Sequence, residues 1–175
     1  MPASFFGSAL ITRSPSFLAS SNSPRFWAAR ANSNSADVLQ FDATNSAVSV
    51  FQNGNQNEVV VSQGAAVDSR IEVLQNQSQN FAVVDQFATS DTVANVVERG
   101  VGNIALVGQT FTSGDGGVTR ANVRQNGDLN LALSTQTDVA RSSVDIRQGT
   151  ADLNSTGSFA VVSQHDGSRL SADID

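Results

Sequence analysis

The feature that most constrains this chain is a repeat of about 23 residues that begins near residue 34. Gln52, Gln75 and Glu98 are 23 residues apart, and Gln125 and Gln148 are again 23 apart after an insertion of four. A fixed period of roughly 20 to 50 residues is typical of repeat architectures, in which one unit buries its apolar side chains only by stacking on its neighbours. The period therefore predicts a stack of similar rungs with a thin core.

Five repeats are present, and each contains two seven-residue segments joined by a short polar turn. The first segments follow the pattern S/T-x5-Q and the second segments follow N-x-A-x3-Q, with a degenerate second segment in the fifth repeat. We expect a leader over residues 1–33, a solenoid over 34–164, and a tail over 165–175 that contains room for an extra strand. The solenoid is divided into a half repeat at 34–40 and repeats at 46–63, 69–86, 92–109, 119–136 and 142–164.

Inside each segment small apolar and polar residues alternate with a period of two, which is the signature of a β-strand. Ser46, Val48, Val50 and Gln52 occupy the odd positions of one first segment, and the other segments repeat this scheme. These positions are expected to face inward. The predicted fold is therefore all-β, a two-sheet β-solenoid of five strand-turn-strand repeats with amyloid-like stacking about 4.8 Å apart.

Hydroxyl and amide side chains recur at the ends of the predicted inward rows. In such a stack each amide can bond to its counterparts in the rungs above and below, which satisfies polar groups that would cost about 1 to 3 kcal/mol each if buried alone. We expect stacking ladders from Ser46, Gln52, Asn57, Gln63, Ser69, Gln75, Asn80, Gln86, Thr92, Glu98, Asn103, Gln109, Thr119, Gln125, Asn130, Gln136, Ser142, Gln148 and Gln164.

These repeats resemble curlin repeats, whose motif is S-x5-Q-x-G-x2-N-x-A-x3-Q. Ser46, Gln52, Gly54, Asn57 and Gln63 match the motif, with Val59 in place of its Ala. The fourth repeat, at 119–136, matches with Thr for Ser, whereas Glu98 and Gln77 depart from the Gln and Gly of the motif, and the fifth repeat departs further. The resemblance covers about residues 34 to 164.

What the resemblance implies is a secreted subunit of an extracellular curli-like amyloid fibre on the bacterial cell surface, serving adhesion and biofilm matrix. It also implies a nucleator subunit, an outer-membrane secretion pore and chaperones as partners. The alternatives that remain are a minor nucleating subunit of the fibre, and a monomeric β-solenoid adhesin that binds a surface with one flat face.

The outward positions of the second segments form an apolar stripe on a face that should meet water. Exposed apolar patches of several hundred Å² usually mark association surfaces. The stripe is interpreted either as a surface for lateral pairing or adhesion, or as a face covered by apolar residues of the leader. This apolar outer face consists of Val60, Phe81, Val83, Ile104, Leu106, Leu131, Leu133, Phe159 and Val161.

Glu98 stands in a column otherwise made of Gln. A carboxylate at this position accepts amide bonds but cannot donate one, and burial would raise its pKa. We expect it to slow stacking at neutral pH, with relief in acid. The alternative is a partly hydrated corner of the solenoid that tolerates the charge.

The first 36 residues differ in charge from the rest of the chain. They carry three Arg and no acid, whereas residues 37–175 carry seven Arg and all sixteen Asp and Glu. All three Pro also lie in this first part, which indicates a leader outside the fold. Arg13 interrupts its apolar stretch, although Ala29-Arg30-Ala31 fits a small-x-small cleavage site.

Composition excludes several functions. The chain has no Cys, no Tyr and one His, so disulfides and a Cys zinc site are excluded, and a Ser-His-Asp mechanism would rest on His165 alone. A net charge of −6 disfavours nucleic acid as a partner. No run approaches the roughly eighteen apolar residues of a membrane span. We therefore expect no enzyme activity, no catalytic residues, no cofactor and no metal.

Overall fold

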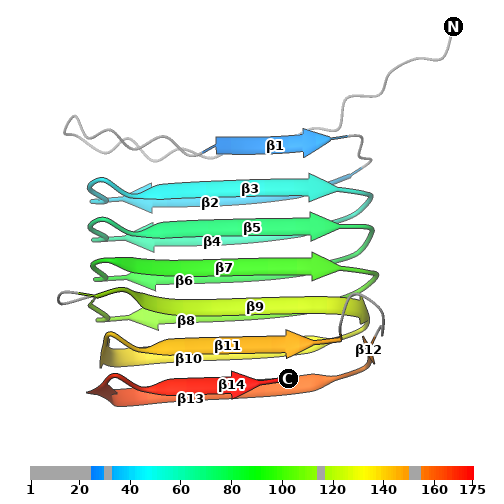
Figure 1. Cartoon of the computed structure of the whole chain (residues 1–175). Coiled ribbons are helices and arrows are strands. Elements are labelled where there is room, and N and C mark those ends of the chain that lie inside the picture. The colour runs from blue at the N-terminus through cyan, green and yellow to red at the C-terminus, as the bar shows by residue number, and fades with distance from the viewer. Residues whose placement is uncertain (1–24, 30–32, 114–116, 150–154) are drawn as a thin grey trace, which may run out of the picture.

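The structure, a computed structural model, describes residues 25–29, 33–113, 117–149 and 155–175. Regular structure in these residues is entirely β-strand, and, apart from one two-residue strand, consecutive strands alternate between two parallel sheets. The strands are stacked as the rungs of a β-solenoid (Figure 1). The predicted all-β, two-sheet solenoid with a spacing of about 23 residues is therefore confirmed. Most of the predicted leader lies outside the described residues.

The first sheet has eight strands. In spatial order they are β1 (Arg25–Ala29), β3 (Ala47–Asn53), β5 (Arg70–Asn76), β7 (Thr92–Arg99), β9 (Thr119–Asp128), β11 (Ser143–Gln148) and β14 (Ser171–Ile174), and the two-residue β12 (Ser155–Thr156) pairs with β9.

The second sheet has six strands. In spatial order they are β13 (Phe159–Ser168), β10 (Leu131–Ala140), β8 (Ile104–Thr110), β6 (Phe81–Phe87), β4 (Glu58–Gly64) and β2 (Ser35–Phe41).

The register places each repeat directly over the next. Gln52 pairs with Gln75 in the first sheet, and Gln63 pairs with Gln86 in the second, so equivalent positions form straight columns. The predicted inward rows are buried: Val48, Val50 and their counterparts make up a core of Val, Ala and Ile between the sheets. One rung alone cannot bury its apolar side chains in so thin a core, so each rung depends on its neighbours for burial.

The arcs that join the second sheet to the first are also stacked. Asp42, Asn45, Asp68 and Asp91 have φ values of 49° to 50°, a left-handed conformation that Asp and Asn tolerate better than most residues. Backbone bonds continue the ladder through the arcs, as in Thr44 N–H to Ala66 O at 2.7 Å. The arcs therefore belong to the stack and are not free loops.

The two ends of the solenoid differ. At the N-terminal end, β1 pairs with β3 in the first sheet, whereas β2 is the edge strand of the second sheet. At the C-terminal end, β13 and β14 form a rung on β10 and β11. β1 falls within the segment predicted as a leader, and β14 falls within the tail in which an extra strand was allowed.

Among the residues that the structure describes, no helix has the length and apolar character needed to cross a membrane.

Candidate functional site: ladders, outer face and open ends

Every predicted ladder residue is buried. In the second sheet an unbroken amide ladder runs through Gln40, Gln63, Gln86, Gln109, Gln136 and Gln164. Each Nε2 donates to the Oε1 of the next glutamine, at 2.5 to 2.8 Å. The donors all point toward the C-terminal end of the solenoid, so this ladder has a direction.

The amide ladder of the first sheet is interrupted at Glu98. Gln52 donates to Gln75 at 2.9 Å, Gln75 donates to Glu98 Oε2 at 2.8 Å, and Gln125 donates to Gln148 at 2.9 Å. Between Glu98 and Gln125 there is no donor, and Glu98 Oε1 and Gln125 Oε1 are both buried without a hydrogen-bond partner in the described part of the chain. A carboxylate thus breaks the ladder, because Glu98 Oε1 and Gln125 Oε1 are both acceptors and no N–H lies between them.

Burial raises the pKa of Glu98 from its ordinary value of 4.5 to about 8, and the Gln75 amide and the Ala105 backbone offset only part of that rise. The direction agrees with the sequence-based prediction. The alternative of a hydrated corner is wrong, because Glu98 has 0% of its surface exposed. Protonation of Oε1 would supply the missing donor for Gln125.

The asparagine ladder bonds in a different way from the glutamine ladders. The backbone N–H of each asparagine donates to the Oδ1 of the preceding one, as in Asn57 to Asn34 at 3.0 Å and Asn80 to Asn57 at 3.0 Å. The side-chain amide also reaches a turn carbonyl in the neighbouring rung, as in Asn80 Nδ2 to Gly100 O at 2.9 Å. Asparagine therefore ties the strand and the turn of two rungs together.

The hydroxyl column is the least regular ladder. Thr92 Oγ1 donates to Ser69 Oγ at 3.0 Å, and the Ser69 backbone N–H donates to Ser46 Oγ at 3.2 Å. Thr119 and Ser142 continue the column, with 3.4 Å from the Ser142 N–H to Thr119 Oγ1. These residues lie where the chain enters the first sheet, and Ser46, Ser69 and Ser142 each also donate to the backbone carbonyl two residues earlier.

The apolar outer face lies on the second sheet, as the alternation predicts. Its members shield one another along the columns, so most are half-buried. Ile104 is 38% exposed, and the face is most open on β13, where Phe159 is 69% and Val161 is 44% exposed. The leader residues that the sequence offers as a cover lie outside the described residues apart from β1, which pairs along the first sheet.

Sequence reasoning missed an aromatic cluster at the corner after the second sheet. Ring centroids of Phe41 and Phe87 are 6.4 Å apart, and those of Phe87 and Phe111 are 6.1 Å apart. The Phe41 ring reaches over Gly64 in the rung between, since a Cβ on Gly64 would lie 2.1 Å from that ring. The available signal in the sequence was that Phe41, Gly64 and Phe87 are 23 residues apart.

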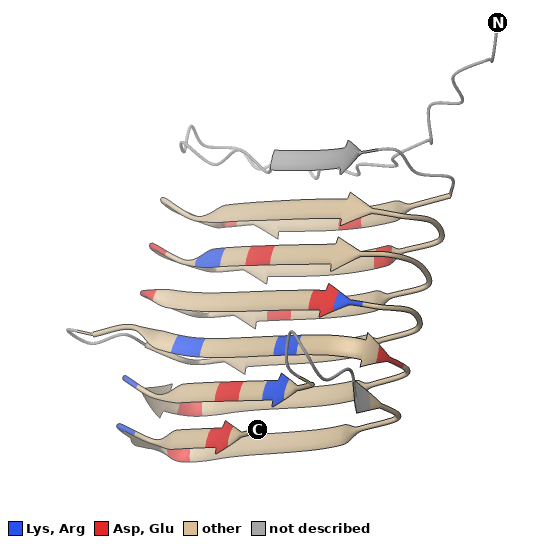
Figure 2. Ribbon diagram, turned by 45° about the vertical axis from the view of Figure 1, so that its right-hand side comes forward, with Lys and Arg blue, Asp and Glu red and all other residues tan. Residues whose placement is uncertain are grey.

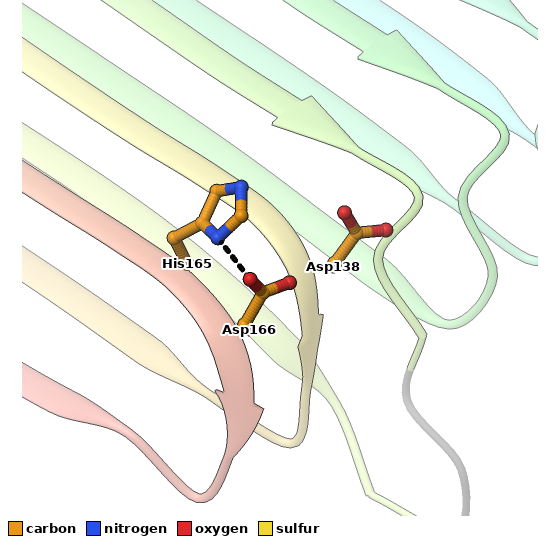
Figure 3. Close-up of side chains that lie close together, drawn as sticks. All are labelled: Asp138, His165 and Asp166. Atoms are coloured by element: carbon orange, nitrogen blue, oxygen red, sulfur yellow. Dashed lines mark ion pairs between the residues drawn. The ribbon is translucent and has the colours of Figure 1, made fainter.

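His165 lies beside two carboxylates at the corner between β10 and β13 (Figure 3). His165 Nδ1 is 2.7 Å from Asp166 Oδ2, and one ligand atom from each of Asp138, His165 and Asp166 lies within 4.8 Å of the others. All three side chains are exposed. Sequence reasoning identified only the neighbouring His165 and Asp166, and the approach of Asp138 follows from the stacking of two corners.

Comparisons with protein-family models, with curated proteins and with solved structures found no match. The resemblance to curlin repeats therefore rests on the repeat residues alone.

Proposed function

We propose that this protein is a structural subunit that polymerises end to end into an extracellular curli-like fibre, and that it is not an enzyme. The observation that carries the proposal is the directional glutamine ladder of the second sheet. It runs through every rung and ends at both edge strands with bonding capacity to spare.

At the N-terminal end, Gln40 Oε1 is buried and accepts no hydrogen bond in the described part of the chain. At the C-terminal end, the Gln164 amide has two N–H groups, and the described residues provide one acceptor, Ser143 O at 3.0 Å. The N-terminal end thus offers an acceptor and the C-terminal end a donor. Two copies placed head to tail would join these groups and continue the ladder.

The backbone supports the same arrangement. β2 and β13 are the edge strands of the second sheet, and each presents one side without a strand partner among the described residues. Open edges pair with other strands unless charge, proline or a covering element blocks them. Neither strand contains proline, and their parallel direction suits a copy that extends the same solenoid.

The wider proposal follows from the resemblance to curlin repeats. It places the fibre outside the cell, in adhesion and biofilm matrix, after export through an outer-membrane pore with the help of chaperones and nucleation by a second subunit.

The experiment is thioflavin T fluorescence over time on the purified full chain at micromolar concentration, with electron microscopy of the end point. We expect growth after a lag, fibres at the end point, and loss of the lag when preformed fibres are added. Thioflavin T fluorescence that stays constant, with or without preformed fibres, from a folded, β-rich monomer would contradict the proposal.

That contradicting result would favour a second candidate, a monomeric surface-binding module. The apolar outer face supports this candidate, because the exposure of Phe159 and Val161 leaves an apolar patch open on β13.

A further inference from the structure

The structure gives β1 a position that conflicts with head-to-tail stacking. In an uninterrupted solenoid, the last rung of one copy, β13 and β14, would lie on the first rung of the next copy, β2 and β3. β13 would then pair with the edge of β2 that has no strand partner among the described residues. β14 would have to pair with β3, whose edge is already occupied by β1 (Figure 1).

The registers locate the overlap. β14 pairs with Ser143–Ile146 of β11, and the columns carry these positions up the first sheet to residues 47–50 of β3. β1 pairs with residues 49–53 of β3, starting with Arg25 opposite Ser49 and Phe26 opposite Val50. The two strands therefore compete for Ser49 and Val50, whereas the last three residues of β1 lie beyond the reach of β14.

The N-terminal edge of the second sheet carries groups that could bind the last rung of another copy. Among the described residues, the edge of β2 has no strand partner, and the buried atoms Gln40 Oε1 and Asn34 Nδ2 at this edge have no hydrogen-bond partner. In the columns of the solenoid, Gln40 corresponds to Gln164 and Asn34 to Ser158. The C-terminal rung of a second copy would thus bring an amide donor to Gln40 and a hydroxyl acceptor to Asn34.

We propose that β1 is a releasable half-cap on the N-terminal end, and that a second copy adds only when Arg25 and Phe26 leave the edge of β3. This inference rests on the proposed end-to-end assembly, concerns the chain that retains residues 25–29, and adds a control step to that assembly. The partner is the C-terminal rung of another copy of this chain. The half-cap occupies the edge of the first sheet, whereas the edge strand of the second sheet, β2, has no further strand on it among the described residues.

The test locks the overlap with a disulfide in the full chain, which has no cysteine of its own. Arg25→Cys with Ser49→Cys places two cysteines at register partners on adjacent strands, within the Cα separation that a disulfide spans. The oxidised monomer is isolated by size and checked on a non-reducing gel. The reduced form of the same variant is the matched control.

We expect oxidised monomers to give no thioflavin T growth, seeded or unseeded, and reduced monomers to grow as the wild type does. A second variant, Trp27→Pro with Ala28→Pro, releases β1 because adjacent residues of a strand direct their N–H groups to opposite sides. It should shorten the lag, and its control is Ser20→Pro with Ser21→Pro, outside β1.

Growth of the oxidised variant at the rate of its reduced form would overturn the half-cap and leave the proposed function intact. An unchanged lag in the released variant would overturn it as well. Absence of fibres from the wild type, the reduced variant and the released variant together would instead contradict the proposed function.

Discussion

At the scale of the residue, Glu98 shows how one atom changes a repeated interaction. Its neighbours in the column are glutamines, each of which donates a hydrogen bond to the next residue of the column. Glu98 accepts a hydrogen bond from Gln75 but donates none to Gln125. The sequence predicted both the odd position and the direction of the pKa change, because the column is visible as a period. The two unpaired oxygens required the structure, since they depend on which way each amide points.

Glu98 should make stability fall with rising pH. Its pKa in the folded protein is about 8 against an ordinary value of 4.5. The stabilisation from protonation is therefore complete below about pH 4.5 and is lost as the pH rises through about 8, by about 1.4 kcal/mol per pH unit at most. Urea unfolding of the monomer, followed by circular dichroism between pH 4 and 9, measures this slope.

Glu98→Gln should remove that slope, because the new amide donates to Gln125 at every pH. We expect the variant to exceed the wild type by roughly 2 to 4 kcal/mol at pH 8 and to match it near pH 4. It should also assemble faster at neutral pH, and equal assembly rates from pH 4 to 8 would contradict this. Glu58→Gln, an exposed position on the second sheet, is the control and should keep the wild-type slope.

At the scale of the element, the turns inside the repeats determine whether one rung fits on the next. Gly54 has φ +124°, and a Cβ there would lie 1.7 Å from Gln77 O in the neighbouring rung. Gln77 stands where the curlin motif has glycine and adopts φ 81°. Close backbone contact thus explains the glycine at position 54, whereas the turn at Gln77 accommodates a side chain that is exposed.

Gly54→Ala should lower the free energy of unfolding by about 2 to 4 kcal/mol, from backbone strain and the clash with Gln77 O. The shift of the urea midpoint measures the loss. Gly108→Ala is the matched control, because a Cβ there meets nothing within 4 Å and φ is not in the left-handed region. It should stay within about 0.5 kcal/mol of the wild type, and equal losses in the two variants would show that the turn contact is unimportant.

At the scale of the whole molecule, charge opposes the proposed assembly while the ladders favour it. Each copy carries a net charge of −6, and in the view of Figure 2 acidic and basic positions are distributed over the rungs rather than gathered at one place. End-to-end stacking brings copies of the same sign within the screening distance of about 8 Å at physiological salt.

Salt should therefore accelerate seeded growth at pH 7.5, because screening weakens the repulsion between copies. Elongation rates from about 0.02 to 0.5 M NaCl measure the effect. Near pH 4.5, the isoelectric point of the sequence, the same salt series should change the rate little. A rate at pH 7.5 that is constant or falls with salt would contradict this prediction.

The period of the sequence was sufficient to predict the solenoid, its two sheets, and the inward columns from Ser46 to Gln164. These features repeat from rung to rung, so the pattern of one segment is also the pattern of its contacts. Features that depend on contacts without a period needed the tertiary structure. They include the pairing of β1 with β3 and the approach of Asp138 to His165. Each is decided by where stacked backbones place residues whose own spacing carries no signal.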